Sequence, residues 1–310
     1  MSKIVLALGG NALGNTPQKQ LELVKNTSRS IADLIESGNE VTVVHGNGPQ
    51  VGMIHLAMSI AANQDEKIPG MPYPECGAMS QGYIGYHLQQ AIGREMQIRK
   101  IDKNVATVIT QVVVDETDPA FKDPTKPVGR FYTKEEADRM AAESGAVFKE
   151  DAGRGYRQVI ASPEPKRIVE IDTVKTLTDH GNVVITVGGG GIPIIETPDG
   201  PGGVMAVIDK DKSAALLATE LDADVLMILT AVDRVCLDFN KDTQREVGEM
   251  TVDEAKEYIR QGQFAPGSML PKVEACISFL EKNPKGRALI SSLESARPAI
   301  EGKTGTVIVA

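Results

Sequence analysis

Short apolar runs alternate along the chain with longer segments in which apolar residues recur every three or four positions. The short runs predict buried strands, and the longer segments predict amphipathic helices. Predicted strands cover residues 4–8, 41–44, 105–114, 183–187, 225–229, 288–291 and 306–309. Predicted helices cover about 18–37, 53–62, 84–92, 134–143, 171–180, 214–221, 252–261 and 272–280. Because the two kinds of element alternate, we expect an α/β fold with a mainly parallel sheet and right-handed crossovers.

Residues 115–162 depart from this pattern. The segment is polar and punctuated by prolines, and its one clear helix, at 134–143, is highly charged. We expect an excursion from the sheet, which could be a small flap or a plain surface insertion. The whole chain is long enough for one large domain or two lobes, and we place a lobe boundary near residues 196–203.

Composition narrows the class of protein. With 33 basic and 42 acidic residues, the net charge of −9 predicts no binding to nucleic acid or to anionic membranes. Three scattered cysteines and four scattered histidines predict a reducing cytoplasm and no structural metal site. The N-terminus lacks the features of a signal peptide, and no apolar segment is long enough to span a membrane.

Three predicted strands end in glycine-rich turns, at residues 9–10, 46–52 and 188–191. In a parallel sheet these ends lie at one edge, where ligands bind. Glycine lets backbone N–H groups approach an anion, and a following helix adds a favourable dipole. Each turn alone is typical of an ordinary α/β fold, but three together favour a phosphate site. The common P-loop and dinucleotide glycine motifs are absent from the sequence.

Lysines in unusual contexts could neutralise such a phosphate. Lys210 lies between Asp209 and Asp211 near a helix start, where the helix dipole disfavours a cation. One interpretation is that Asp211 is a plain N-cap and its two neighbours are solvated. Lys126 lies in a proline-bounded loop, and Lys272 begins an apolar-faced helix. Phosphoryl transfer depends on positive charge around the moving group, so these lysines are candidates for that role.

Several stretches together resemble the carbamate kinases of the amino acid kinase family, and the resemblance runs nearly end to end. They are residues 7–12, 45–52, 104–115, 123–127, 150–155, 187–193, 208–211 and 267–272. The resemblance implies a three-layer α/β/α sandwich around a mainly parallel open sheet. It also implies an N-terminal lobe for the carbamoyl group (1–202), a nucleotide lobe (203–310) and a protruding subdomain at about 115–162.

By this resemblance the protein is a cytoplasmic homodimeric enzyme of arginine metabolism. It would transfer a phosphoryl group reversibly between ATP and carbamate, mostly making ATP from carbamoyl phosphate and ADP. Mg²⁺ would be carried by the nucleotide phosphates. The implied catalytic residues are Lys126, Lys210, Asp211 and Lys272. Implied substrate-binding residues are Gly9, Gly10, Asn11, Gly46, Asn47, Gly52, Gly189 and Gly190. Implied nucleotide-binding residues are Thr230, Ala231, Val232, Asp233, Gly267, Ser268 and Met269.

One departure from the wider family is informative. Many of its members carry a lysine two residues before the first Gly-Gly pair, where this chain has Ala7. The missing charge would come from Lys126 and Lys210, which favours a carbamate kinase over the acetylglutamate, aspartate or uridylate kinases. Two alternatives remain: a sister acyl-phosphate kinase, and a regulator that binds nucleotide or carbamoyl phosphate without turnover.

Overall fold

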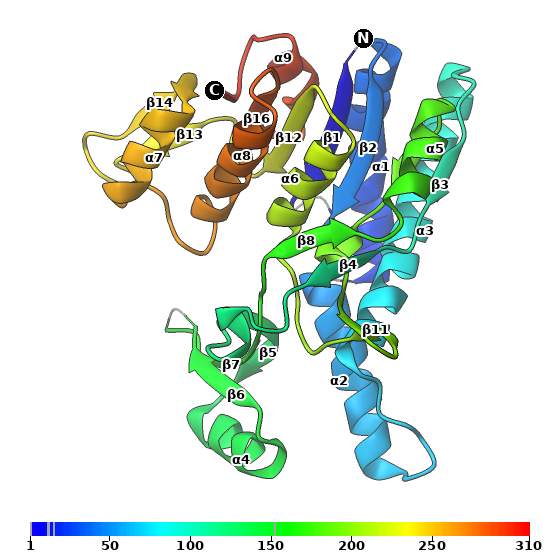
Figure 1. Ribbon diagram of the computed structural model, residues 1–310, viewed down its shortest axis with the longest axis vertical. Coiled ribbons are helices and arrows are strands. Elements are labelled where there is room, and N and C mark those ends of the chain that lie inside the picture. The colour runs from blue at the N-terminus through cyan, green and yellow to red at the C-terminus, as the bar shows by residue number, and fades with distance from the viewer. Residues whose placement is uncertain (1, 11–12, 15, 152) are drawn as a thin grey trace.

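The structure is a computed structural model that describes residues 2–10, 13–14, 16–151 and 153–310 (Figure 1). The helices are α1 (Pro17–Glu36), α2 (Gly48–Gln64), α3 (Tyr73–Arg99), η2 (Pro119–Phe121), α4 (Lys134–Ser144), α5 (Ile171–Asp179), η3 (Gly188–Gly190), α6 (Lys210–Glu220), α7 (Val252–Arg260), α8 (Leu270–Lys282) and α9 (Ala296–Ile300). The strands are β1 (Lys3–Leu8), β2 (Glu40–His45), β3 (Val105–Thr107), β4 (Gln111–Val114), β5 (Lys126–Tyr132), β6 (Val147–Glu150), β7 (Tyr156–Ile160), β8 (Pro165–Ile168), β9 (Val183–Ile185), β10 (Ile192–Thr197), β11 (Gly200–Gly203), β12 (Val225–Thr230), β13 (Val235–Leu237), β14 (Arg245–Val247), β15 (Glu249–Thr251), β16 (Arg287–Ser292) and β17 (Thr306–Val309).

Within the described residues, the main sheet has eight strands in the order β15-β17-β16-β12-β1-β2-β9-β3. The strands from β16 to β3 are parallel to one another, whereas β17 pairs with β16 in the antiparallel direction. Strand β1 lies inside the sheet, between β2 and the much later strand β12. The sheet is therefore mainly parallel, as predicted.

Helices cover both faces of this sheet, and the side chains of β1 alternate between two cores. Val5 and Ala7 point to the core built with α5, α6 and α8, whereas Ile4, Leu6 and Leu8 point to the core built with α1 and α3. All five side chains are fully buried, which explains why the run is continuously apolar. The result is the predicted three-layer α/β/α sandwich (Figure 1).

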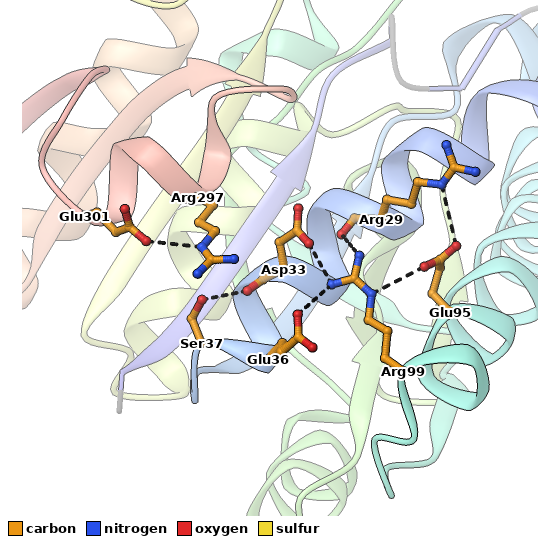
Figure 2. Close-up of polar contacts among 8 residues, drawn as sticks. All are labelled: Arg29, Asp33, Glu36, Ser37, Glu95, Arg99, Arg297 and Glu301. Atoms are coloured by element: carbon orange, nitrogen blue, oxygen red, sulfur yellow. Dashed lines mark hydrogen bonds and ion pairs between the residues drawn. The ribbon is translucent and has the colours of Figure 1, made fainter.

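Helices α1 and α3 are joined by an ion cluster at their ends (Figure 2). The guanidinium of Arg99 donates to Asp33 at 2.6 Å and to Glu36 at 3.1 Å, and it lies 3.4 Å from Glu95. It also donates to the backbone carbonyl of Arg29. Partial burial would lower the pKa of Arg99, but the neighbouring carboxylates outweigh burial and raise it. The cluster links two helices that cover the same face of the sheet.

A second, four-stranded sheet and a small subdomain lie below the main sheet (Figure 1). The four-stranded sheet has the order β11-β10-β4-β8, and the subdomain consists of the three-stranded sheet β5-β7-β6 with α4. Thr133 and Glu136 form a reciprocal capping box at the start of α4, and Gly145 ends the helix in the left-handed conformation. Strand β5 of this subdomain packs against α2, and the bounds of about 115–162 for the whole excursion stay a prediction.

Two predictions about the elements were wrong. The run 105–114 forms two strands in different sheets, because the side chain of Gln81 bonds both the N–H and the carbonyl of Thr110, at 2.8 and 3.0 Å. Helix α2 begins at Gly48 rather than at residue 53, since Pro49 fits the first turn of a helix. The division into lobes near 196–203 stays a prediction; this stretch contains the end of β10 and the strand β11.

In the part of the chain that the structure describes, no helix combines the length and apolar character needed to cross a membrane.

Candidate active site

Turns that follow the carboxyl ends of parallel strands surround a cavity of about 310 Å³. The turns after β1 and β2, the tight turn η3 after β9 and the start of α6 all contribute to its wall. The lining residues include Gly10, Gly46, Asn47, Gln50, Lys126, Gly189, Asp209, Lys210, Asp211, Gly267, Ser268 and Lys272. The convergence predicted for the three glycine turns is therefore observed.

Asp209 caps helix α6. One of its carboxylate oxygens, Oδ1, accepts the backbone N–H of Asp211 at 2.9 Å. The interpretation of Asp211 as the N-cap was therefore wrong, because the capping carboxylate belongs to the residue two positions earlier. Asp211 lies inside the first turn, where its negative charge is favoured by the helix dipole.

Asp211 bridges two lysines. Its Oδ1 accepts a hydrogen bond from Lys210 Nζ at 2.5 Å, and its Oδ2 accepts one from Lys272 Nζ at 2.9 Å. The Asp211 side chain is only 4% exposed. Burial alone would raise its pKa, but the charges of Lys210 and Lys272 outweigh burial and lower it. Asp211 is thus a buried carboxylate that fixes two ammonium groups beside the cavity.

Lys126, the first residue of β5, reaches the same place from the subdomain. Its Nζ donates to Asp209 Oδ2 at 2.6 Å. Burial would raise the pKa of Asp209, but the charge of Lys126, its hydrogen bond and the charge of Lys210 lower it to about 2. Both aspartates are therefore ionised at neutral pH, and the three lysines predicted from sequence lie in one cluster.

A second cavity, of about 600 Å³, adjoins the first. Gly9, Thr230, Ala231, Leu293 and Glu294 line it together with residues that also line the first cavity. The shared residues are Gly10, Lys210, Gly267, Ser268 and Lys272. Two lysines thus stand where the cavities meet, which is where a group passing from one ligand to another would lie.

Two glycines of the η3 turn combine a close approach to other atoms with a positive φ. A Cβ on Gly189 would lie 2.1 Å from Asn47 Nδ2, and one on Gly190 would lie 2.4 Å from the carbonyl oxygen of Ile208. Both residues also have positive φ, at 68° and 95°. The Gly190 carbonyl accepts from Ser213, so Gly190 supports the cavity wall through α6.

The other predicted residues occupy different places. Gly52 lies within α2 and faces the subdomain, and Asn11 lies outside the described residues. Met269 packs against the core, Val232 is exposed, and Asp233 accepts a hydrogen bond from Ser292 at 2.5 Å. Thr230, Ala231, Gly267 and Ser268 line the second cavity, and their role in nucleotide binding stays a prediction.

Sequence reasoning missed Asp209 and Gln50. The position of Asp209 before a helix was only a partial signal, because Asp211, two residues later, is an equally good N-cap by residue type. Gln50 Nε2 donates to the Gly14 carbonyl and to Gln20 Oε1, both at 2.9 Å. Because both partners are acceptors, the amide orientation is defined, and its buried oxygen has no hydrogen-bond partner among the described residues.

A mainly parallel sheet between helical layers, with lysines where two cavities meet beyond the strand ends, defines an α/β phosphotransferase. Comparisons with known proteins place it more closely. A family model, "Amino acid kinase family", matches residues 2–287. The chain therefore belongs to the amino acid kinase family.

Individual relatives agree with the resemblance seen in the sequence. The chain is 56% identical over 308 residues to a carbamate kinase of Staphylococcus haemolyticus, with 99% of both chains covered. Carbamate kinase from Giardia lamblia bound to AMP-PNP is 43% identical with a TM-score of 0.92, covering 99% of this chain and 98% of that one. A protein of Aeropyrum pernix is 39% identical with a TM-score of 0.93, covering 99% of both chains.

Proposed function

We propose that the protein is a carbamate kinase that runs mainly towards ATP. Carbamoyl phosphate would bind in the 310 Å³ cavity and ADP in the adjoining one. The bond between phosphorus and the carbamoyl oxygen breaks as a bond forms to the terminal oxygen of ADP. The products are ATP and carbamate, and carbamate then breaks down to ammonia and CO₂. The observation that carries this proposal is the lysine cluster at the junction of the two cavities.

Lys210 and Lys272 act on the transferring phosphoryl group. In a loose transition state the negative charge lies on the phosphoryl oxygens, and fixed ammonium groups stabilise it without reorganising. Asp211 holds both ammonium groups from behind. Lys126 approaches from the side of the carbamoyl group. It adds the positive charge that other family members obtain from a lysine where this chain has Ala7. The turns at Gly10, Gly46 and Gly189 offer the backbone N–H groups that bind the phosphate.

Mg²⁺ would enter with the nucleotide phosphates and neutralise part of their charge. Among the described residues, no group of three or more His, Cys, Asp or Glu side chains is arranged to hold a metal ion. Asp209 and Asp211, the carboxylates that line the first cavity, are paired with lysines, and Glu294 lines the second cavity. We therefore propose that the nucleotide phosphates supply the main ligands of Mg²⁺.

We also propose that the protein is a cytoplasmic homodimer that works in arginine metabolism. The edge strand β3 supports a dimer, because Tyr86 and Ile109 beside it are 59% and 44% exposed. Light scattering in solution tests this part directly: a mass of one chain would contradict it.

A coupled assay tests the activity. ADP, Mg²⁺ and carbamoyl phosphate should give ATP, and acetyl phosphate or acetylglutamyl phosphate should give far less. Preference for another acyl phosphate would favour a sister kinase. Binding of carbamoyl phosphate with no ATP formed would favour a regulator, although the intact set of Lys126, Lys210, Asp211 and Lys272 supports turnover.

A further inference from the structure

We propose that Asp209 is a positioning residue for Lys126, in the same way that Asp211 positions Lys210 and Lys272. This inference rests on the proposed function and assigns a task to a residue that sequence reasoning left in solvent. In this proposal the motif Asp209-Lys210-Asp211 contains two orienting carboxylates. Asp209 orients Lys126, and Asp211 orients Lys210 and Lys272.

The two oxygens of Asp209 do different work. Oδ1 is held by the backbone N–H of Asp211, so the carboxylate cannot rotate freely. Oδ2 therefore points in a defined direction, and Lys126 Nζ meets it at 2.6 Å. The Asp209 side chain is 15% exposed and that of Lys126 36%, so the pair lies at the cavity wall rather than on the open surface.

This contact joins two separate parts of the structure. Lys126 opens β5 of the subdomain, whereas Asp209 belongs to the start of α6, which packs on the main sheet. A lysine on a flexible four-carbon stem loses considerable rotamer freedom when it is fixed, and a preformed ion pair removes that cost before substrate arrives. An ammonium group has three donors, so Lys126 can keep Asp209 and still donate to a bound anion.

A purely structural role for Asp209 predicts something different. If the residue only caps α6, asparagine should replace it without loss, because asparagine caps helices about as well. Asp209→Asn keeps the cap and removes the charge that orients Lys126. We expect the melting temperature and the KM for ADP to stay near those of the wild type. The kcat with carbamoyl phosphate should fall by about 10- to 100-fold, as for other orienting partners.

Kinetic coupling to Lys126 is the decisive measurement. Wild type, Asp209→Asn, Lys126→Met and the double variant form a cycle. In the Lys126→Met background, Asp209→Asn should cause no further loss of kcat. Equal losses in both backgrounds would overturn the proposal, as would normal kcat in Asp209→Asn. Asp209→Ser is a second variant that keeps a capping oxygen and removes the charge. It should show the same loss of kcat as Asp209→Asn.

A second readout does not depend on turnover. Lysine acetylation by dilute acetic anhydride, followed by mass spectrometry, should label Lys126 several-fold faster in Asp209→Asn than in the wild type. Exposed Lys25 is the internal reference, and Asp118→Asn is the matched control, because Asp118 is also an N-cap. Unchanged labelling of Lys126 would overturn the proposal. Failure of the proposed function would instead appear in the wild type, as absence of ATP formation.

Discussion

A Cβ atom added to Gly52 in α2 would lie 3.0 Å from both the backbone nitrogen and the Cα of Gly129 in β5. The two glycines thus lie where α2 passes close to the subdomain. We expect this contact to limit how near the subdomain, which carries Lys126, can lie to the cavity wall.

We expect Gly52→Ala to push the subdomain outward and withdraw Lys126 from the cavity. Alanine favours a helix over glycine by about 1 kcal/mol, so stability should be kept while kcat/KM for carbamoyl phosphate falls. The matched control is Gly77→Ala in α3, where the added carbon would meet its nearest neighbour at an ordinary 3.9 Å. Equal activity of the two variants in the coupled assay would contradict this.

Replacement of Lys210 or Lys272 by alanine should lower kcat by about 10²- to 10⁴-fold, or about 3–5 kcal/mol, without unfolding the protein. Both lysines line the junction of the two cavities, where we expect charge to develop in the transition state. Lys212 is the control: it lies on the same helix but pairs with Glu164, away from both cavities. A folded Lys272→Ala protein with near-normal kcat would remove Lys272 from the mechanism.

Asp211→Asn should reduce both activity and stability. The structure changes the expectation that follows from a simple cap, because Asp211 is buried and paired with two lysines. Loss of its charge leaves two ammonium groups close together and uncompensated, which costs on the order of 3 kcal/mol. Urea unfolding would measure the loss, with Asp209→Asn as a control that keeps its cap. A fully stable variant would mean that the lysines find other partners.

Much of the fold and of this site was predictable, because periodicity and local charge are properties of neighbouring residues. The helix start at Lys210 and the cluster of lysines followed from such local patterns and from family resemblance. Two features could not be found in this way. The break inside 105–114 depends on Gln81, which is distant in sequence. Local preference also cannot decide between Asp209 and Asp211 as the cap, since both are good capping residues at a helix start.

Folding stability should fall as the pH drops from about 6.5 to 4 because of His45. Burial lowers the pKa of His45 to about 4, against the smaller effect of the Gly46 carbonyl, which accepts from Nδ1 at 2.9 Å. His45 therefore takes up a proton near pH 6.5 in the unfolded chain, but only near pH 4 in the folded protein. The stability is complete above pH 6.5, and about 3 kcal/mol is lost by pH 4.

His45→Gln should remove this part of the pH dependence. Chemical unfolding at several pH values measures the free energy of unfolding of both proteins. Subtracting one from the other cancels the contributions of other groups that titrate in the same range. Parallel curves for the two proteins would show that His45 is not responsible.

The subdomain should close further over bound substrate, beyond the contact between Lys126 and Asp209 that already links it to α6. Closure would exclude water from an acyl phosphate that hydrolyses readily. Backbone amides within 115–162 should exchange quickly with D₂O in the free enzyme and slowly with a carbamoyl phosphate analogue. Lys126→Ala should impair use of carbamoyl phosphate while ADP binding stays nearly intact. Equal protection with and without the analogue would make the subdomain a rigid insertion.

The position of β1 also shapes how this chain can acquire its structure. Ile4 pairs with Val225, so the first strand leaves the ribosome more than two hundred residues before one of its two neighbours exists. During synthesis β1 can pair with β2, but its other edge stays open, and an open apolar strand edge invites aggregation. We therefore expect nascent chains that end before residue 225 to need chaperone protection, and refolding from denaturant to be slow.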